Sequence, residues 1–158
     1  MPRRPAKRRP ASYYLAAGVD LRAEAARLAS LPALGGPDGC LATDPPELTV
    51  RRASRPPRRT LGFAVPTENR LSVTVYPGIG RGDLLETLLH ELTHLAVGEL
   101  PGSRRWHGRE FRLTLALAMD QAYGVVPTRP LPPAARHGVY AGRIERLLAS
   151  AHAHEPAA

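Results

Sequence analysis

Apolar and polar positions along the first half of the chain predict one helix followed by three short strands. Apolar residues recur three and four positions apart over residues 20–30, which predicts a helix. Residues 35–46 are rich in glycine, proline and aspartate and are expected to form a loop. Alternating polarity and strand-forming residues then predict three strands: 47–52, 58–65 and 71–76.

Residues 83–98 form the most apolar of the predicted helices. Leucines and Ala96 cover its whole surface except for one polar stripe, as a buried helix requires. The stripe consists of Thr87, His90, Glu91 and His94. Asp83 is expected at the N-cap, with Glu86 three residues later as in a capping box, and Gly98 is placed to end the helix.

The remainder of the chain predicts two more helices. A loop over residues 98–105, which contains Pro101, is expected to turn the chain back antiparallel. A second apolar helix is predicted from about His107 to Tyr123, and a short closing helix over residues 139–150. The proline-rich stretch between them, 125–133, cannot be helical and is expected to act as a semi-rigid connector.

Length, charge and cysteine content narrow the class of protein. The 158 residues fit one domain, predicted over 12–127, preceded by a disordered basic arm (1–11) and followed by the connector and closing helix (128–158). The net charge of +8 and the pI of about 10.7 favour acidic partners, nucleic acid first among them. The single cysteine, Cys40, excludes an internal disulfide and a cysteine-based metal site. We therefore expect a cytoplasmic protein. The apolar stretch from Tyr13 to Val19 is only as long as the shortest secretion signals and ends at Asp20, and no apolar run reaches the length of a membrane span.

Within the leucine-rich helix, residues 90–94 read His-Glu-Leu-Thr-His. Residues four apart share one helix face, so His90 and His94 can present imidazole nitrogens to one metal ion, with Glu91 beside them. Zinc suits imidazole, and catalytic zinc sites combine three protein ligands with a water whose pKa falls to about 7. Glu91 can act as the general base for that water. The motif therefore predicts a metallopeptidase with one zinc ion per chain, the alternative being a polar helix face that meets solvent.

A catalytic zinc site needs a third ligand. His107 is the favoured candidate, because the loop before the second apolar helix returns the chain toward the end of the first. Glu110, three residues further on, is the competing ligand and otherwise a candidate hydrogen-bond partner for an imidazole N–H. His137 receives no role, and His152 and His154 are interpreted as surface residues.

These motifs together resemble a known family. The His-Glu-Leu-Thr-His sequence, followed after 12 residues by His-Gly-Arg-Glu-Phe at 107–111, resembles the SprT-like zinc metallopeptidases. Gly62 and the strand over 70–76 are similar to the paired strands that precede the metal helix in that family. The resemblance covers about residues 19–124. It implies three zinc ligands and one catalytic residue: His90, His94, His107 and Glu91.

The order of elements predicts an α+β, zincin-like domain. A small antiparallel-rich sheet is expected to pack on the metal helix and on the second ligand-bearing helix, with the site in a cleft below the sheet edge. The strand order is not determined by the sequence. Many members of the family carry a C-terminal zinc ribbon with four cysteines, which this chain lacks because it has only Cys40. The resemblance also implies proteolysis of DNA-bound proteins.

Two segments concentrate positive charge. The N-terminal arm carries five cations that we predict to contact nucleic acid: Arg3, Arg4, Lys7, Arg8 and Arg9. Residues 51–59 contain five arginines and two adjacent prolines, and they form either a solvated connection or a patch that contacts phosphate. With no stacking aromatic expected near either segment, contact with nucleic acid should be salt-sensitive and independent of base sequence.

Two other functions stay open at this point. The chain could be a basic DNA-binding or regulatory protein with a structural or vestigial metal, in which case Glu91→Gln leaves every activity intact. Alternatively, the site hydrolyses a different amide, because the motif does not dictate the substrate. The residue that stabilises the oxyanion is undetermined among several arginines and three tyrosines: Tyr76, Tyr123 and Tyr140.

Overall fold

A computed structural model describes residues 8–98, 107–124 and 141–153 of the chain. These residues include three short 3-10 helices: η1 (Ala11–Tyr14), η2 (Pro32–Leu34) and η3 (Pro66–Glu68). The strands are β1 (Leu15–Ala16), β2 (Val19–Asp20), β3 (Glu47–Arg52), β4 (Gly62–Val65) and β5 (Arg70–Val75). The helices are α1 (Leu21–Ala29), α2 (Cys40–Thr43), α3 (Arg81–Val97), α4 (Arg109–Tyr123) and α5 (Ala141–Ala153).

The main sheet has three strands in the order β3-β5-β4. β4 pairs with β5 in antiparallel fashion, whereas β3 pairs with β5 in parallel, from Glu47 opposite Arg70 to Arg52 opposite Val75. The sheet is therefore mixed, and the expectation of an antiparallel-rich sheet holds only for the β4–β5 hairpin and the small β1–β2 pair. The parallel pair arises because residues 53–61 carry the chain from one side of β5 to the other before the hairpin returns it to the middle. For the same reason the strand predicted over 58–65 begins only at Gly62.

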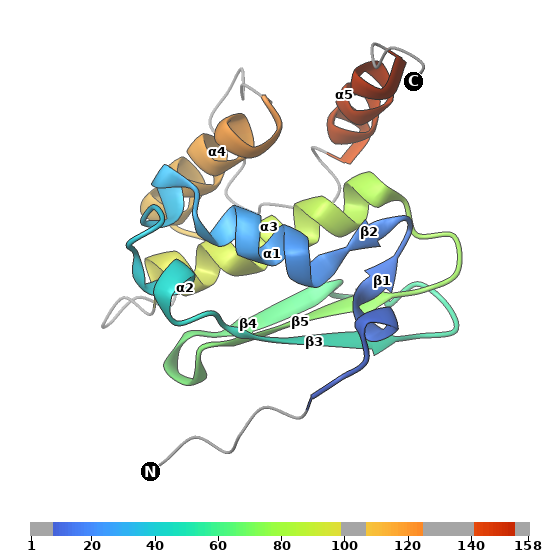
Figure 1. Cartoon of the computed structure of the whole chain (residues 1–158), viewed down its shortest axis with the longest axis horizontal. Coiled ribbons are helices and arrows are strands. Elements are labelled where there is room, and N and C mark those ends of the chain that lie inside the picture. Colours follow the sequence, from blue (N-terminus) through green and yellow to red (C-terminus); the bar gives the residue numbers. More distant parts are fainter. Residues whose placement is uncertain (1–7, 99–106, 125–140, 154–158) are drawn as a thin grey trace.

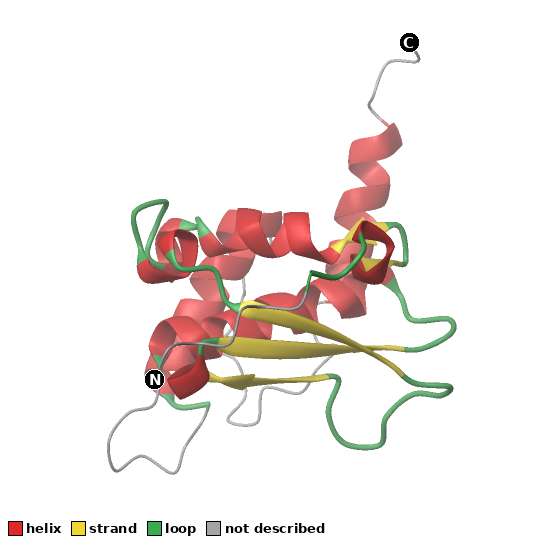
Figure 2. Ribbon diagram, turned by 60° about the horizontal axis from the view of Figure 1, so that its bottom comes forward, coloured by secondary structure: helices red, strands yellow, loops and turns green. Residues whose placement is uncertain are grey.

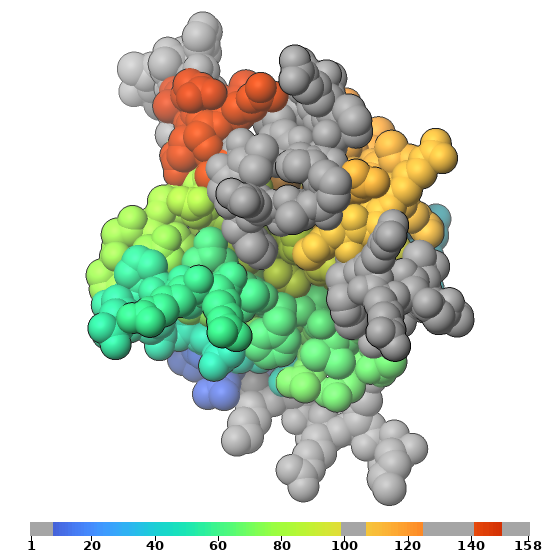
Figure 3. Space-filling view, turned by 180° about the vertical axis from the view of Figure 1, so that it is seen from behind, coloured from blue at the N-terminus to red at the C-terminus, as the bar shows by residue number. Residues whose placement is uncertain are grey.

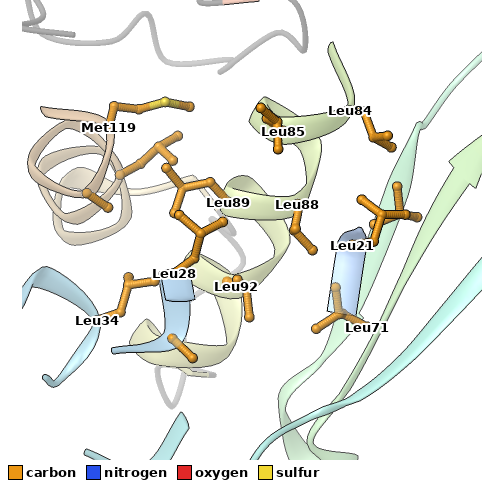
Figure 4. Close-up of a cluster of buried hydrophobic side chains, with 14 of the residues drawn as sticks. Leu21, Leu28, Leu34, Leu71, Leu84, Leu85, Leu88, Leu89, Leu92 and Met119 are labelled. Atoms are coloured by element: carbon orange, nitrogen blue, oxygen red, sulfur yellow. The ribbon is translucent and has the colours of Figure 1, made fainter. Parts of the chain in front are cut away.

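The helices lie on one face of this sheet, as the two ribbon views show (Figures 1 and 2). α3 runs across that face in the middle of the molecule and contacts β4, β5, α1, α4 and α5. Leucines from several sides of α3 reach the core together with residues of its neighbours (Figure 4): Leu84, Leu85, Leu88, Leu89 and Leu92 with Leu21, Leu28, Leu71 and Met119. This packing explains why α3 lacks the single apolar face of a surface helix. The fold is α+β, as predicted.

The start of α3 differs from the prediction. The helix begins at Arg81. Its N-cap is Gly80, which has no side chain that could form a cap hydrogen bond. A turn in which Ile79 N–H donates to the Tyr76 carbonyl precedes the helix. Asp83 falls inside the first turn, so the predicted capping box is wrong. Glu86 is instead buried, at 5% exposed. Gly98 ends the helix, as predicted, with a φ of 73°.

The other elements follow the sequence pattern closely. α1 is capped by Asp20, whose carboxylate accepts hydrogen bonds from Arg22 N and Ala23 N at 3.0 and 3.1 Å. The predicted loop over 35–46 contains the short helix α2, because a Gly36–Gly39 turn allows one helical turn to form. α4 and α5 match the second apolar helix and the closing helix. The predictions for residues 99–105 and 125–133 lie outside the described residues. Among the helices that the structure describes, none is both long and apolar enough to cross a membrane.

Candidate metal centre

Two elements bring three histidines to one point. His90 and His94 lie one turn apart on α3, and His107 lies two residues before the start of α4. Their Nε2 atoms are 3.2 Å apart for His90 and His94, 3.1 Å for His90 and His107, and 3.1 Å for His94 and His107. His90 is buried and the other two are partly buried. Within the described residues this trio is the only group of three or more potential ligands close enough to hold one metal ion.

The geometry of the trio fits a cation. Each neutral imidazole nitrogen carries either one proton or one lone pair, so three mutually close Nε2 atoms cannot all be satisfied by hydrogen bonds to one another. Two nitrogens that bind one zinc ion tetrahedrally at 2.0–2.1 Å lie about 3.3 Å apart, close to the 3.1–3.2 Å separations here. Burial also lowers the pKa of His107, which favours the neutral imidazole that binds metal. The three residues can therefore hold a metal ion.

Phe111 supports this cluster, and the sequence analysis gave it no role beyond its place in the family motif. It is 2% exposed, and its ring centroid lies 4.3 Å from that of His94, 5.0 Å from that of His90 and 4.9 Å from that of His107. Its position four residues after His107, on the buried face of α4, was the available signal. Phe111 restricts the rings of the three histidines and connects α4 to the trio.

Glu91 lies next to the trio in the interior and is 3% exposed. Burial raises the pKa of its carboxyl to about 8. Gly62 of β4 packs directly on it: a Cβ at this glycine would lie 3.0 Å from Glu91 Cγ, 3.0 Å from Thr87 Cγ2 and 2.7 Å from the Ser72 carbonyl oxygen. Glycine is therefore needed at position 62 for the strand to approach α3 this closely.

The two threonines of α3 within the described residues form hydrogen bonds inside the helix. The Thr87 hydroxyl donates to the Asp83 carbonyl at 2.7 Å, and the Thr93 hydroxyl donates to the Leu89 carbonyl at 2.8 Å. Each threonine thus donates its hydroxyl proton to the preceding turn of the same helix. The titratable side chains of the α3 stripe are His90, Glu91 and His94.

The remaining candidates lie elsewhere. Glu110 is exposed on the first turn of α4 and does not belong to the histidine group. The Tyr123 hydroxyl donates to Glu24 Oε1 at 2.9 Å, which ties the end of α4 to α1. Tyr76 packs against the hydrophobic core, and Tyr140 lies outside the described residues. No tyrosine is thereby assigned to the oxyanion.

The basic segments have aromatic neighbours, contrary to the expectation. The Arg9 guanidinium carbon lies 5.0 Å from the Tyr13 ring centroid, and that of Arg51 lies 5.9 Å from the Phe63 ring centroid. The tyrosine is close in sequence, but Phe63 comes near because β3 and β4 flank the same strand. Arg8 and Arg9 are exposed, whereas the other predicted cations of the arm, Arg3, Arg4 and Lys7, lie outside the described residues.

The β3–β4 connection borders a pocket of about 260 Å³ at the end of the sheet. Two arginines, two threonines and an aromatic ring are among its lining residues: Arg51, Arg52, Thr60, Thr74 and Phe63. The connection forms part of the surface in the space-filling view (Figure 3, teal to green). Within the part of the chain that the structure describes, the five arginines of residues 51–59 form no ion pair with a carboxylate.

Comparisons with known proteins place this arrangement in a family. Searches of curated proteins and of solved structures found no match. A family model, described as the SprT-like family, matches residues 41–137. That span is more than half of the chain and contains the three clustered histidines and Glu91. The protein therefore belongs to the SprT-like family.

Proposed function

We propose that this protein is a zinc-dependent peptidase with a zincin-like site. The observation that carries the proposal is the convergence of three imidazole Nε2 atoms within 3.1–3.2 Å, one residue away from a buried carboxyl. His90, His94 and His107 would hold the zinc ion, which when bound supplies Lewis acidity to a water and to the scissile carbonyl. Three imidazoles without a cysteine are typical of a catalytic zinc site.

In this proposal Glu91 moves the proton. Its carboxylate takes a proton from the attacking water and returns it to the leaving nitrogen, which is general acid–base catalysis. In the metal-free chain the raised pKa of about 8 keeps the carboxyl mostly protonated at neutral pH. A cation held by His90 beside it favours the ionised form, because an opposite charge lowers the pKa of a carboxyl. Metal binding thus prepares Glu91 for its role.

β4 offers a place for the substrate. It is an edge strand of the main sheet, and its Gly62 packs on Glu91. An extended peptide can add to such an edge through main-chain hydrogen bonds. A substrate bound there would lie close to Glu91 without needing a particular side chain, which is consistent with a peptidase of broad sequence preference.

The first test is the zinc content of purified untagged protein. We expect about one zinc per chain in the wild type and in Glu110→Ala, and little in His107→Ala. If the wild type takes up no zinc, the peptidase proposal is wrong. If Glu110→Ala loses zinc and His107→Ala keeps it, the ligand set is two histidines and a glutamate.

The second test is proteolysis. Glu91→Gln should retain zinc, and its activity should be about 10²–10⁴-fold lower than that of the wild type, because the general base is removed while the ligands stay. If Glu91→Gln keeps every activity of the wild type, the metal is structural and the chain is better described as a basic DNA-binding or regulatory protein.

We further propose that the substrates include proteins associated with DNA. The support is the pocket at the β3–β4 connection, where arginines that pair with no carboxylate of the described residues lie beside threonines and Phe63. Arginine can neutralise phosphate, and an aromatic ring beside it can stack on an unpaired base. The cations of the N-terminal arm would provide further contacts with phosphate.

Binding of a labelled single-stranded oligonucleotide, followed by anisotropy at two salt concentrations, tests this addition. Arg51→Ala should weaken binding and reduce its dependence on salt, and Phe63→Ala should weaken binding to single strands more than to duplex. Arg143→Ala, an exposed arginine on α5, is the matched control. Equal losses in Arg51→Ala and Arg143→Ala would contradict a role for the pocket.

A further inference from the structure

The N-cap residue of α3 cannot bond the helix start through a side chain. This residue is Gly80, which has no side chain to bond the free amides of the first turn. Unbonded amides at a helix start are normally satisfied by a nearby serine, threonine, aspartate or asparagine. The helix that carries the metal-binding residues therefore needs an acceptor from elsewhere in the chain.

α5 supplies that acceptor. Glu145 Oε1 accepts a hydrogen bond from Gly82 N at 2.5 Å, and Glu145 Oε2 lies 3.8 Å from Arg81 Nη2. The two helices meet where α3 begins, as the arrangement of α3 and α5 shows (Figure 1). A carboxylate at this position also suits the partial positive charge of the helix N-terminus. Glu145 thus caps α3 from a residue 63 positions away in sequence.

The backbones of α3 and α5 also approach each other closely at Gly82 and Ala141. A Cβ on Gly82 would lie 2.2 Å from the Ala141 carbonyl oxygen, 2.9 Å from the Ala141 carbonyl carbon and 2.9 Å from Glu145 Cγ. No L side chain larger than hydrogen fits such an approach without moving one helix. On the other side of the contact, Ile144 is 0% exposed and Ala141 is 8% exposed, so α5 is anchored in the core.

We propose that α5 is a positioning element for the metal site, and that Glu145 is the residue through which it acts. Gly82 and His90 are eight residues apart, about 12 Å along one helix. A helix transmits a displacement of its first turn along its axis, because its successive turns are connected by hydrogen bonds. α3 is further held at Glu91 by Gly62, so a shift of its start changes the placement of His90 and His94 relative to His107.

This role is not part of what the family match describes, since the match ends at residue 137 and α5 begins at Ala141. The inference rests on the metal site of the proposed function. It does not require that the site cleave peptides, because the property that α5 controls is the geometry of the histidines.

The test compares full-length wild type, Glu145→Ala, Glu145→Gln and Arg143→Ala. Arg143 is an exposed neighbour on the same helix and serves as the matched control. Co²⁺ is the probe, because its visible absorption reports coordination geometry while its affinity is titrated. Hydrogen exchange of the first-turn amides of α3 is measured in parallel, and thermal unfolding verifies that each variant is folded.

We expect Glu145→Ala to bind Co²⁺ about fivefold or more weakly, with an altered spectrum and faster exchange at Gly82. Glu145→Gln, which keeps an acceptor oxygen at the same length, should restore most of the affinity, and Arg143→Ala should match the wild type. A folded Glu145→Ala with wild-type affinity and spectrum would overturn the inference, even if exchange at Gly82 is faster.

The outcomes separate this inference from the proposed function. A wild type that takes up Co²⁺ but cleaves nothing contradicts the peptidase proposal and leaves the positioning role supported by the Co²⁺ data of the variants. A wild type that takes up no Co²⁺ contradicts both.

Discussion

Two glycines let backbone pack closely against a glutamate, once where β4 meets α3 and once where α3 meets α5. The two contacts serve different purposes. At the first contact, Gly62 belongs to β4 and lies against Glu91 of α3, with 3.0 Å from its would-be Cβ to Glu91 Cγ. At the second, Gly82 belongs to α3 and lies against Glu145 of α5, with 2.9 Å to Glu145 Cγ. One contact lies at the candidate metal centre and the other at the start of the helix.

The two glutamates differ in environment. Glu91 is 3% exposed and its pKa is raised by burial, which suits a group that exchanges a proton with a substrate. The Glu145 side chain is 41% exposed and bonds to a backbone amide, which suits a cap. A close glycine therefore does not by itself mark a catalytic residue; the solvation of the carboxylate distinguishes the proton-transfer role proposed for Glu91 from the capping role of Glu145.

The largest effect expected from this difference in environment is a pH dependence of the free energy of unfolding, caused by Glu91. In metal-free protein the folded-state pKa is about 8, against an ordinary value of 4.5. The contribution of this group to stability is complete below about pH 4.5 and is lost as the pH rises toward 8, at roughly 1.4 kcal/mol per pH unit. Urea unfolding in a chelator at pH 5 and pH 8 measures it.

Glu91→Gln is the control for that measurement, since glutamine does not titrate. The variant should show a smaller loss of stability between pH 5 and pH 8 than the wild type. Identical pH profiles for the two proteins would mean that Glu91 is solvated in the folded chain, and the contrast with Glu145 would disappear.

Gly82→Ala should be the most destabilising substitution at either glycine. The new methyl group meets the carbonyl of Ala141, a backbone atom that cannot rotate away, so we expect a loss of about 3 kcal/mol. Chemical denaturation measures the change. Gly142→Ala is the matched control, because its Cβ would meet only Arg146 Nη1 at 3.7 Å. Equal stabilities of the two variants would show that α5 does not pack on Gly82.

Gly62→Ala should destabilise less and impair the site more. The methyl group meets the Ser72 carbonyl oxygen at 2.7 Å, but its other close neighbours are side-chain atoms that can shift. We expect about 2 kcal/mol of lost stability, together with a displaced Glu91 and reduced peptidase activity at retained zinc content. Loss of zinc with normal activity per bound zinc would contradict the assignment of this contact to Glu91.

The smallest effect is expected at Ser72, whose carbonyl forms part of the Gly62 contact. The residue is 2% exposed, and its hydroxyl has no hydrogen-bond partner among the residues that the structure describes. Ser72→Ala removes a buried polar group without a partner and should stabilise the fold by about 1 kcal/mol or leave it unchanged. A thermal melt measures this, and a clear loss of stability would reveal a bond to that hydroxyl.

Much of the local structure could be predicted from the sequence. The bounds of α1, α4 and β3 follow from periodicity, from the Asp20 cap and from Gly124 at the end of α4. The pairing of His90 with His94 follows from helix geometry alone, because four residues make about one turn. The approach of His107 was a hypothesis about a loop, and Phe111, which packs on all three imidazoles, was noted only as part of the family motif.

The predictions that were wrong concern contacts between distant segments. Asp83 was expected to cap α3, but Glu145 bonds to that helix start instead. The main sheet was expected to be antiparallel-rich, but β3 pairs with β5 in parallel. In both cases the sequence offers a plausible local solution, and the structure uses a residue or strand that only the folded chain brings close.

The sequence by itself therefore determined the helix that bears the motif, the imidazole side chains that could bind a metal ion, and the class of fold. These depend on residues within a few turns of one another. The tertiary structure decided the strand order, the burial of Glu91 under Gly62 and the capping of α3 by α5. These depend on which surfaces pack together once loops close, and neither periodicity nor motif spacing encodes that packing.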